Sequence, residues 1–330
     1  MTHASPHDHH PAAAPGHTGA HAHGPAHTHG GTHAHTHGPS GAAPGTDDMA
    51  ELLDLGAEVL AGHTAEITAW LPVAEPPRRI LDLGAGTGAG TFALLARFPA
   101  AEVTAVDASP AHLERLREKA EALGVAGRVH TVPADLDGEW PELDRPDLVW
   151  ASASLHHMAD PARTLRTVYD LLAPGGLLAV VEMAGFPRFL PPDAPQERPG
   201  LEDRCHAAVD RQHAEQMPHR GADWGPMLAA AGFAVEGERT VRVFVEGAAG
   251  AEGAAGAVGA DGAESAADSA VGRYALGSLR RLREAVGAEL PAEDLRALDR
   301  LLDTAGPSSV LRRGDLAVRT ERAVWAARRA

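Results

Sequence analysis

Several residue types are scarce in this chain, and each scarcity argues against a class of function. Cys205 is the only cysteine among 330 residues, which excludes intramolecular disulfides and cysteine metal clusters. No stretch approaches the roughly 20 apolar residues that cross a bilayer. No apolar run follows a basic N-terminal region, as it would in a secretory signal. We therefore expect a cytoplasmic protein without membrane insertion.

Positive charge is also in short supply. The chain has 29 Lys and Arg against 45 Asp and Glu, which gives a net charge of −16 at pH 7. A molecule this acidic repels a phosphate backbone, so we expect no nucleic-acid partner. The apolar fraction of 44% is nevertheless enough for a sizeable core, and the length favours one domain with low-complexity additions.

Two segments contain almost no large apolar residues. Residues 1–46 are mainly His, Ala, Gly, Pro and Thr, and residues 247–271 are mainly Gly and Ala. Ordering either would bury too little surface to offset its backbone entropy. We expect a disordered tail and a flexible loop, with residues 47–330 as the folded domain. His-x-His pairs in the tail, such as His21 and His23, predict weak divalent metal binding; we expect no defined metal site, because no carboxylate or cysteine completes one.

Between these segments, short apolar runs alternate with amphipathic ones. Continuous apolar strands joined by helices indicate a parallel sheet covered on both faces. Lead-in helices are expected over 47–72. The predicted strands are 80–83, 102–106, 128–132, 147–151, 177–181, 234–246 and 316–328, and the predicted helices are 91–98, those after Ser109-Pro110 and Asp160-Pro161, 274–286 and 292–302.

A glycine-rich turn joins the first strand of the predicted sheet to the helix that follows. It reads Asp82-Leu83-Gly84-Ala85-Gly86-Thr87-Gly88. Glycines there allow positive φ and a close approach of the backbone to a ligand. Asp107 ends the second strand, where a carboxylate can bind ribose hydroxyl groups. The turn alone could be a tight connection, but together with this acid it predicts a nucleoside-containing cofactor.

Two further acids bear on which cofactor this is. Asp82, before the first glycine, would repel a pyrophosphate but favours a ligand that carries an ammonium or sulfonium group. Asp135 follows the third strand, where it can accept a hydrogen bond from an adenine amino group. Both features argue against NAD, although an NAD-dependent oxidoreductase stays an alternative.

Together these motifs resemble the class I methyltransferases that depend on S-adenosylmethionine (SAM), in particular the small-molecule branch with the ubiquinone and menaquinone enzymes. The resemblance rests on the segments ILDLGAGTG, VTAVDAS, PADL and LVWASASLHHMAD. It implies an α/β, Rossmann-like sheet of seven strands with helices on both faces and the last strand antiparallel. It also implies methyl transfer from SAM to a small-molecule acceptor. The SAM-binding residues that it implies are Asp82, Gly84, Ala85, Gly86, Gly88, Asp107, Ala108, Ala134, Asp135, Leu136 and Ser152.

Candidate residues for the chemistry follow the fourth and fifth strands. Methyl transfer from a sulfonium depends mainly on alignment, and a base is needed only where the acceptor must lose a proton. His156 and His157 could supply that base, or they could cap the turn or pack against the cofactor. Glu182 could bind the acceptor or could instead accept hydrogen bonds from backbone amides.

Residues 185–224 are expected to form an insertion that builds the acceptor site. His206 and His213 lie seven positions apart and would share one face of a helix, which makes them candidate acceptor ligands. The alternative is a solvated helix of mixed charge.

Two features that the sequence lacks narrow the range of possible methyl acceptors. No Asn/Asp-Pro-Pro-aromatic segment follows the fourth strand, and Cys205 lies far from it. We therefore expect O- or C-methylation of a small molecule and not methylation of a nucleobase. The other alternative is a SAM- or metal-binding regulatory protein without turnover.

Overall fold

The computed structural model describes residues 46–247, 269–287 and 289–330. The predicted tail and Gly/Ala loop lie outside these residues, apart from their edges. The chain divides into residues 1–41 and 42–330, and the fold below belongs to the second unit. Across the described residues, no helix is long and apolar enough to cross a membrane.

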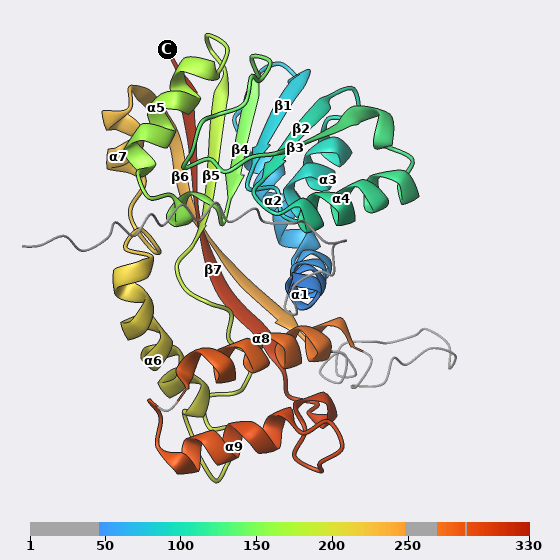
Figure 1. The fold of residues 1–330 in the computed structure, drawn as a ribbon, viewed down its shortest axis with the longest axis vertical. Helices are drawn as coiled ribbons and strands as arrows, with labels where there is room; N and C mark the ends of the chain where they lie inside the picture. Colours follow the sequence, from blue (N-terminus) through green and yellow to red (C-terminus); the bar gives the residue numbers. More distant parts are fainter. Residues whose placement is uncertain (1–45, 248–268, 288) are drawn as a thin grey trace, which may run out of the picture. The chain divides into compact units, whose positions relative to one another are not determined.

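A seven-stranded sheet forms the centre of the fold (Figure 1). The strands are β1 (Arg79–Leu83), β2 (Glu102–Asp107), β3 (Val129–Pro133), β4 (Leu148–Ser152), β5 (Leu177–Met183), β6 (Phe233–Glu246) and β7 (Ala317–Arg329). Their order is β3-β2-β1-β4-β5-β7-β6. The first five pair in parallel, whereas β7 is antiparallel to both β5 and β6. The predicted mixed sheet with an antiparallel last strand is confirmed.

Helices cover both faces of this sheet. They are α1 (Thr46–Val59), α2 (Ala61–Trp70), α3 (Ala89–Arg97), α4 (Pro110–Ala122), α5 (Pro161–Leu171), α6 (Leu201–Gln216), α7 (Gly225–Ala230), α8 (Ala270–Val286) and α9 (Ala292–Leu302). Apolar side chains of α2 and α3 pack on one face of the sheet, and those of α5 and α7 pack on the other. The covered strands β4 and β5 are buried almost throughout, which explains their continuous apolar sequences.

The starts of two helices confirm the capping signals in the sequence. Ser109 and Asp160 each accept a hydrogen bond from the backbone N–H three residues later, and a proline occupies the first turn of each helix. Such a side chain satisfies one of the free N–H groups at a helix start. Helix α4 begins directly after β2, whereas α5 begins after a short turn that follows β4.

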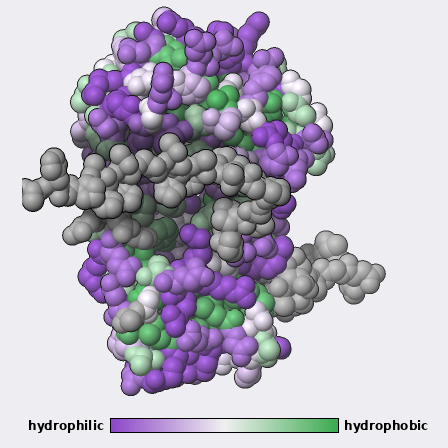
Figure 2. Space-filling model, in the orientation of Figure 1, coloured by the Kyte–Doolittle hydropathy of each residue, from purple (hydrophilic) through white to green (hydrophobic). Residues whose placement is uncertain are grey.

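Strands β6 and β7 run beyond the other strands toward α8 (Figure 1). There α6, α8 and α9 surround a second core, which includes Leu201, Leu279 and Leu298. Figure 2 shows the visible face as mainly hydrophilic, with hydrophobic residues gathered in its middle and lower part. The sequence-predicted insertion at 185–224 contributes α6 to this second core.

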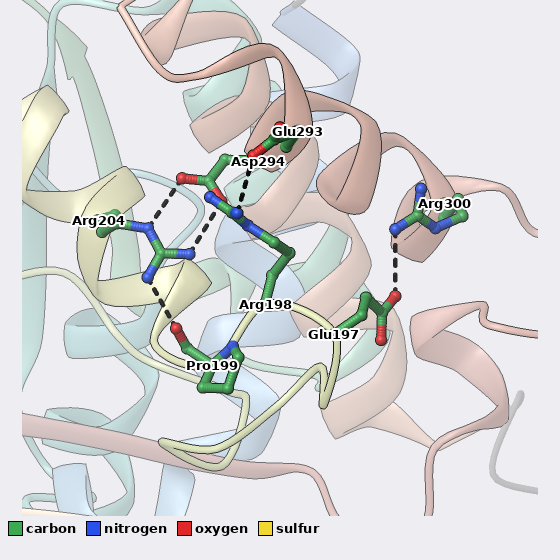
Figure 3. A network of polar contacts seen from close by, with 7 residues as sticks. All are labelled: Glu197, Arg198, Pro199, Arg204, Glu293, Asp294 and Arg300. Carbon is green, nitrogen blue, oxygen red and sulfur yellow. Dashed lines mark hydrogen bonds and ion pairs between the residues drawn. The ribbon is translucent and has the colours of Figure 1, made fainter.

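A buried carboxylate ties α9 to α6 and to the segment before it (Figure 3). The side chain of Asp294 is fully buried and accepts hydrogen bonds from Arg198 Nε at 2.6 Å and from Arg204 Nε at 2.8 Å. The Arg204 guanidinium donates a second bond at 2.9 Å, so it binds the carboxylate in a fork. These arginines hold the pKa of Asp294 at about 2.

This network predicts a loss of stability in acid. Because the folded-state pKa of Asp294 is depressed, its ionised form contributes stability that is fully present above about pH 4 and is lost as the pH falls toward 2. We expect Asp294→Asn to lower the free energy of unfolding at pH 7 by about 2 kcal/mol and to reduce the loss between pH 4 and pH 2. Urea denaturation at several pH values measures both effects.

Asp299→Asn is the matched control, because Asp299 pairs with Arg283 on the surface with 54% of its side chain exposed. An exposed pair contributes at most about 1 kcal/mol. Equal losses for the two variants would contradict a special role of Asp294.

Candidate functional site

The glycine turn follows β1 and leads into α3. Gly84, Gly86 and Gly88 all have positive φ, at 68°, 54° and 96°. The N–H groups of Gly84 and Ala85 both donate to the carbonyl oxygen of Val106, at 2.8 and 3.0 Å. A Cβ atom on Gly84 would lie only 2.5 Å from the Cβ of Ser154. Only glycine fits at this position, and the turn is held against β2 on one side and the end of β4 on the other.

Asp107 ends β2 directly beside this turn. Its Oδ2 accepts a hydrogen bond from Gly86 N–H and its Oδ1 accepts one from Ser109 N–H, both at 2.8 Å. His112 Nδ1 lies 3.3 Å from Oδ1. Burial acts to raise the pKa of Asp107, but the bonds from His112, Ser109 and Gly86 outweigh it and lower the pKa below its usual value. The side chain is therefore an ionised acceptor beside the glycines.

Asp82 lies near the end of β1, before the glycine turn. Its side chain is buried, with 2% exposed, and its Oδ2 accepts a hydrogen bond from Thr91 Oγ1 at 2.7 Å. Burial, and to a lesser extent the charge of Asp107, raises the pKa of Asp82 to about 7. The structure thus places Asp82 where it binds Thr91 near the start of α3; its contact with a cationic ligand group stays a prediction.

We expect Asp82→Asn to stabilise the protein at alkaline pH. Because the folded-state pKa of this acid is raised to about 7, the native state binds more protons than the unfolded chain, and stability falls as the pH rises from about 4 to 7. Asparagine keeps the acceptor for Thr91 without a buried charge. The free energy of unfolding at pH 8 should rise by roughly 1–2 kcal/mol, with little change at pH 4; urea titrations measure both. A loss of stability at pH 8 would contradict the assigned burial.

The remaining predicted cofactor residues lie at neighbouring strand ends. Ala134 N–H donates to the carbonyl oxygen of Asp107 at 3.1 Å, which brings the end of β3 beside that of β2. Asp135 is exposed and its Oδ1 accepts from Asp137 N–H at 3.0 Å. Ala108 is exposed, Leu136 is 5% exposed and Ser152 is half-buried at the end of β4. All of them follow the carboxyl ends of adjacent parallel strands, where ligands of such sheets bind.

Glu182, near the end of β5, holds the turn that follows β4. Its Oε1 accepts from the N–H groups of Ser154 and Leu155 at 3.2 and 2.9 Å. Its Oε2 lies 2.6 Å from Nδ1 of His156. All of these groups are buried. Of the two roles open to Glu182 from the sequence, the structure shows the one in which it accepts from backbone amides, and both of its oxygens are engaged.

The two adjacent histidines differ in environment. His156 is 2% exposed and His157 is exposed, with their ring centroids 4.1 Å apart. Because an ionised carboxylate only accepts hydrogen bonds, Nδ1 of His156 carries a proton toward Glu182, and its Nε2 is left as the nitrogen that can accept one. Partial desolvation of the ring, and to a lesser extent the neighbouring imidazole of His156, lowers the pKa of His157.

The candidate acceptor ligands of α6 are not brought to this cluster by any contact in the described residues. His206 is 4% exposed, its ring stacks on Phe186 with centroids 6.2 Å apart, and its Nε2 lies 3.9 Å from Glu202 Oε1. His213 lies in α6 as well, which confirms that both belong to one helix, but its side chain is outside the described residues. Burial raises the pKa of Cys205 to about 12, so this thiol is not a nucleophile.

Helix α1 lies over the glycine turn, a feature that the sequence did not show. A Cβ atom on Gly86 would lie 3.5 Å from Cδ1 of Leu53. Asp54, the next residue, pairs with Arg115 and Lys119 of α4, and Lys119 Nζ also donates to the carbonyl oxygen of Thr87 at 3.0 Å. The lead-in helix thus covers one side of the turn.

Sequence reasoning also missed three side chains that shape the site. Thr91 binds Asp82, His112 binds Asp107, and Arg322 of β7 lies opposite Met183 at the end of β5. The contact of His112 with Asp107 could have been predicted from the sequence, because His112 lies in the first turn of the helix that follows Asp107. The position of Arg322 could not have been predicted, because it depends on the register between β5 and β7, which lie far apart in the chain.

Comparisons with known proteins agree with this geometry. Residues 81–178 match the family described as "Methyltransferase domain". The chain is 43% identical over 116 residues to the trans-aconitate 2-methyltransferase of Methylobacterium radiotolerans, which covers 35% of this chain and 42% of that protein. It is 43% identical over 106 residues to the malonyl-[acyl-carrier protein] O-methyltransferase of Halorhodospira halophila, and the match covers 32% of this chain and 35% of that protein.

A third relative belongs to the branch that the sequence resembles. The demethylmenaquinone methyltransferase of Thermus thermophilus is 34% identical over 150 residues, which covers 44% of this chain and 64% of that protein. The chain thus spans less than two thirds of the length of each of these relatives. The resemblance drawn from the motifs is confirmed for the part of the chain that carries the glycine turn.

Proposed function

We propose, from the premise that residues 81–178 are a class I SAM-dependent methyltransferase domain, that this chain transfers a methyl group from SAM to a small-molecule acceptor. The observation that carries the proposal is the juxtaposition of the three positive-φ glycines with the ionised side chain of Asp107. An ionised carboxylate accepts hydrogen bonds from hydroxyl groups such as those of a ribose.

The residues at the carboxyl edge of the sheet fit this cofactor. Gly84 and Gly86 leave room for close approach of a ligand to the backbone, Asp107 would bind the ribose, and Asp135 and Leu136 would flank the adenine. The buried Oγ of Ser154 has no hydrogen-bond partner among the described residues and lies against Gly84. An unpaired polar atom at this place is what a bound polar ligand would satisfy.

The side chains after β4 and β5 would then serve the transfer. When bound, SAM supplies a methyl group on an activated sulfonium leaving group. The Glu182 carboxylate fixes the turn at Ser154 and Leu155 and orients His156 with Nε2 free to accept a proton. We infer that His156 takes the proton from an acceptor hydroxyl or carbon acid as the new bond to the methyl group forms. His157 is the second candidate for this role.

The comparisons support small molecules or small acyl groups as acceptors. The relatives are named for the acceptors trans-aconitate, malonyl-[acyl-carrier protein] and demethylmenaquinone. The first two acceptors carry carboxyl groups, and the third relative represents the quinone branch. Because the relatives are named for acceptors of these kinds, we propose O- or C-methylation for this chain.

Turnover with methyl-labelled SAM tests the proposal. Purified protein is incubated with labelled SAM and a cell metabolite extract, and labelled products and S-adenosylhomocysteine are followed by mass spectrometry. We expect one or more labelled small molecules to form. SAM binding without any methyl transfer would favour the alternative, a SAM- or metal-binding regulatory protein. Among the described residues, no group of three metal-ligating side chains is close enough to hold a metal ion.

A further inference from the structure

Arg322 is a half-buried cation without a counterion in the described part of the chain. No hydrogen bond or ion pair is found for its guanidinium there, and its Nη1 is buried without a partner. Burial lowers the pKa of Arg322, but an arginine stays protonated in proteins. Arg97 shows the contrast: its Nη1 is also unpaired, yet its Nη2 donates to the carbonyl oxygen of Leu71. A buried donor without a partner destabilises a fold, which makes the Arg322 guanidinium a candidate site for an anion.

The nearest candidate counterion within the chain is already in use. The charge of Glu182 acts on Arg322 and opposes the lowering of its pKa. Both oxygens of Glu182, however, accept hydrogen bonds from the turn after β4. In the sheet, Glu182 lies opposite Ala323 and Met183 lies opposite Arg322, so Glu182 and Arg322 point to opposite faces. Glu182 therefore attracts a cation without pairing with it.

The sheet places Arg322 on the face that carries Ser152. Ser152 lies opposite Val181, Val181 opposite Val324, and Met183 opposite Arg322. Residues two apart on a strand, and residues directly opposite each other, share a face. Arg322 therefore lies on the same face as Ser152, with β5 between their strands. Neighbouring strands are about 4.8 Å apart, so the guanidinium is within reach of a small molecule at the end of β4.

Helix α1 connects this arginine to the glycine turn. Leu53 lies against Gly86, and Gly56, one turn further along α1, lies against the hydroxyl group of Tyr274, 3.3 Å from the position of a Cβ atom. Tyr274 is buried and packs edge-on against Phe189, with the ring centroids 5.3 Å apart. Burial raises the pKa of Tyr274, and the charge of Arg322 counteracts part of this rise. The Tyr274 hydroxyl and the Arg322 guanidinium thus influence each other electrostatically. The positions of α1 that contact the Tyr274 hydroxyl and the glycine turn are about one helical turn, or roughly 5 Å, apart.

We propose that Arg322, together with the hydroxyl group of Tyr274, binds a carboxylate of the methyl acceptor. One guanidinium and one hydroxyl group match a planar, singly charged anion in charge and in hydrogen-bond donors. A phosphate dianion would bring more negative charge next to Glu182 than this single cation balances. The inference rests on the proposed function and names its substrate class: an acceptor that carries a carboxylate in addition to the hydroxyl group or carbon atom that is methylated.

Thermal unfolding tests the anion site without any need for turnover. Protein saturated with S-adenosylhomocysteine is unfolded in benzoate or citrate and, for comparison, in chloride at the same ionic strength. We expect the carboxylates to raise Tm by about 2–4 °C over chloride, and Arg322→Met and Arg322→Lys to remove this difference. The Tm of Arg322→Met in chloride should equal or exceed that of the wild type, because an unpaired, half-buried charge is removed.

The control is Arg242→Met. Arg242 lies in β6 opposite Glu321, next to Arg322 in the sheet but on the other face, with 85% of its side chain exposed. This variant should keep the carboxylate effect. A carboxylate effect equal in wild type and Arg322→Met, no carboxylate effect in the wild type, or a lower Tm for Arg322→Met in chloride would each overturn the proposal; the last result would assign Arg322 a structural role.

A second experiment tests whether the anion site at Arg322 binds the methyl acceptor. A metabolite extract is split on an anion-exchange resin, and both fractions are offered with methyl-labelled SAM. We expect methyl transfer with the retained, anionic fraction and a loss of about tenfold or more in Arg322→Met at unchanged SAM affinity. Transfer only with the unretained fraction would overturn the proposal while leaving the methyltransferase activity established. Absence of methyl transfer with both fractions would count against the proposed function. The thermal-unfolding experiment would then decide separately whether Arg322 binds an anion.

Discussion

Replacing Asp107 by alanine is expected to weaken SAM binding by about 100-fold or more. The reason is that an ionised carboxylate beside the glycine turn loses its bonds to the ribose, and each hydrogen bond to a charged group contributes roughly 1.5–3 kcal/mol. The variant also frees the N–H groups of Gly86 and Ser109, which Asp107 now binds at 2.8 Å. Isothermal titration calorimetry with SAM measures the dissociation constant directly.

Glu102→Ala provides the control for this result. Glu102 begins the same strand, at the opposite edge of the sheet, and is 62% exposed, with only a 3.9 Å approach to His130. Its removal should leave SAM affinity within about threefold of the wild type. If Asp107→Ala bound SAM as tightly as Glu102→Ala does, the assignment of the ribose ligand would be wrong.

Replacing Glu182 by glutamine should reduce methyl transfer by about 100-fold while leaving SAM affinity nearly unchanged. The glutamine carbonyl oxygen can still accept from Ser154 and Leu155. Its amide group, however, would donate to Nδ1 of His156, where the carboxylate now accepts at 2.6 Å. The histidine would then carry its proton on Nε2 and could not act as the base. Steady-state kinetics with the acceptor found in the metabolite screen gives kcat for both proteins.

Glu238→Gln is the matched control, because Glu238 is an exposed acid in β6 and should give wild-type kinetics. Thermal unfolding checks that Glu182→Gln stays folded. A kcat within threefold of the wild type would exclude His156 as the base and leave His157, or alignment without a base, to account for the reaction.

The sequence predicted the elements of this fold well because local signals agree with the sheet. Continuous apolar runs correspond to strands buried on both faces, and the cap residues Ser109 and Asp160 begin their helices as expected. The antiparallel pairing of β7 followed from the family resemblance and not from the strand sequence itself. The Gly84–Gly88 turn and Asp107 could be placed from the sequence because each lies at the end of a strand that leads into a helix.

The side-chain arrangement of the candidate site was harder to predict, because it depends on partners far apart in the chain. Whether Asp82 faces a ligand or Thr91 depends on which side of β1 the helix α3 packs. The two interpretations of Glu182 could be separated only by the approach of Ser154 and Leu155 to β5. Arg322 could not be found at all, since its place beside Met183 requires the register between β5 and β7.

Cofactor choice is the central claim, and calorimetric titration of the full chain with SAM, and separately with NAD and NADP, tests it most directly. We predict saturable binding of SAM, competition by S-adenosylhomocysteine, and no binding of either nicotinamide cofactor, because the segment that carries the glycine turn and Asp107 matches a methyltransferase domain. Binding of a nicotinamide cofactor with no response to SAM would contradict the methyltransferase assignment and return the glycine turn to a dinucleotide-binding role.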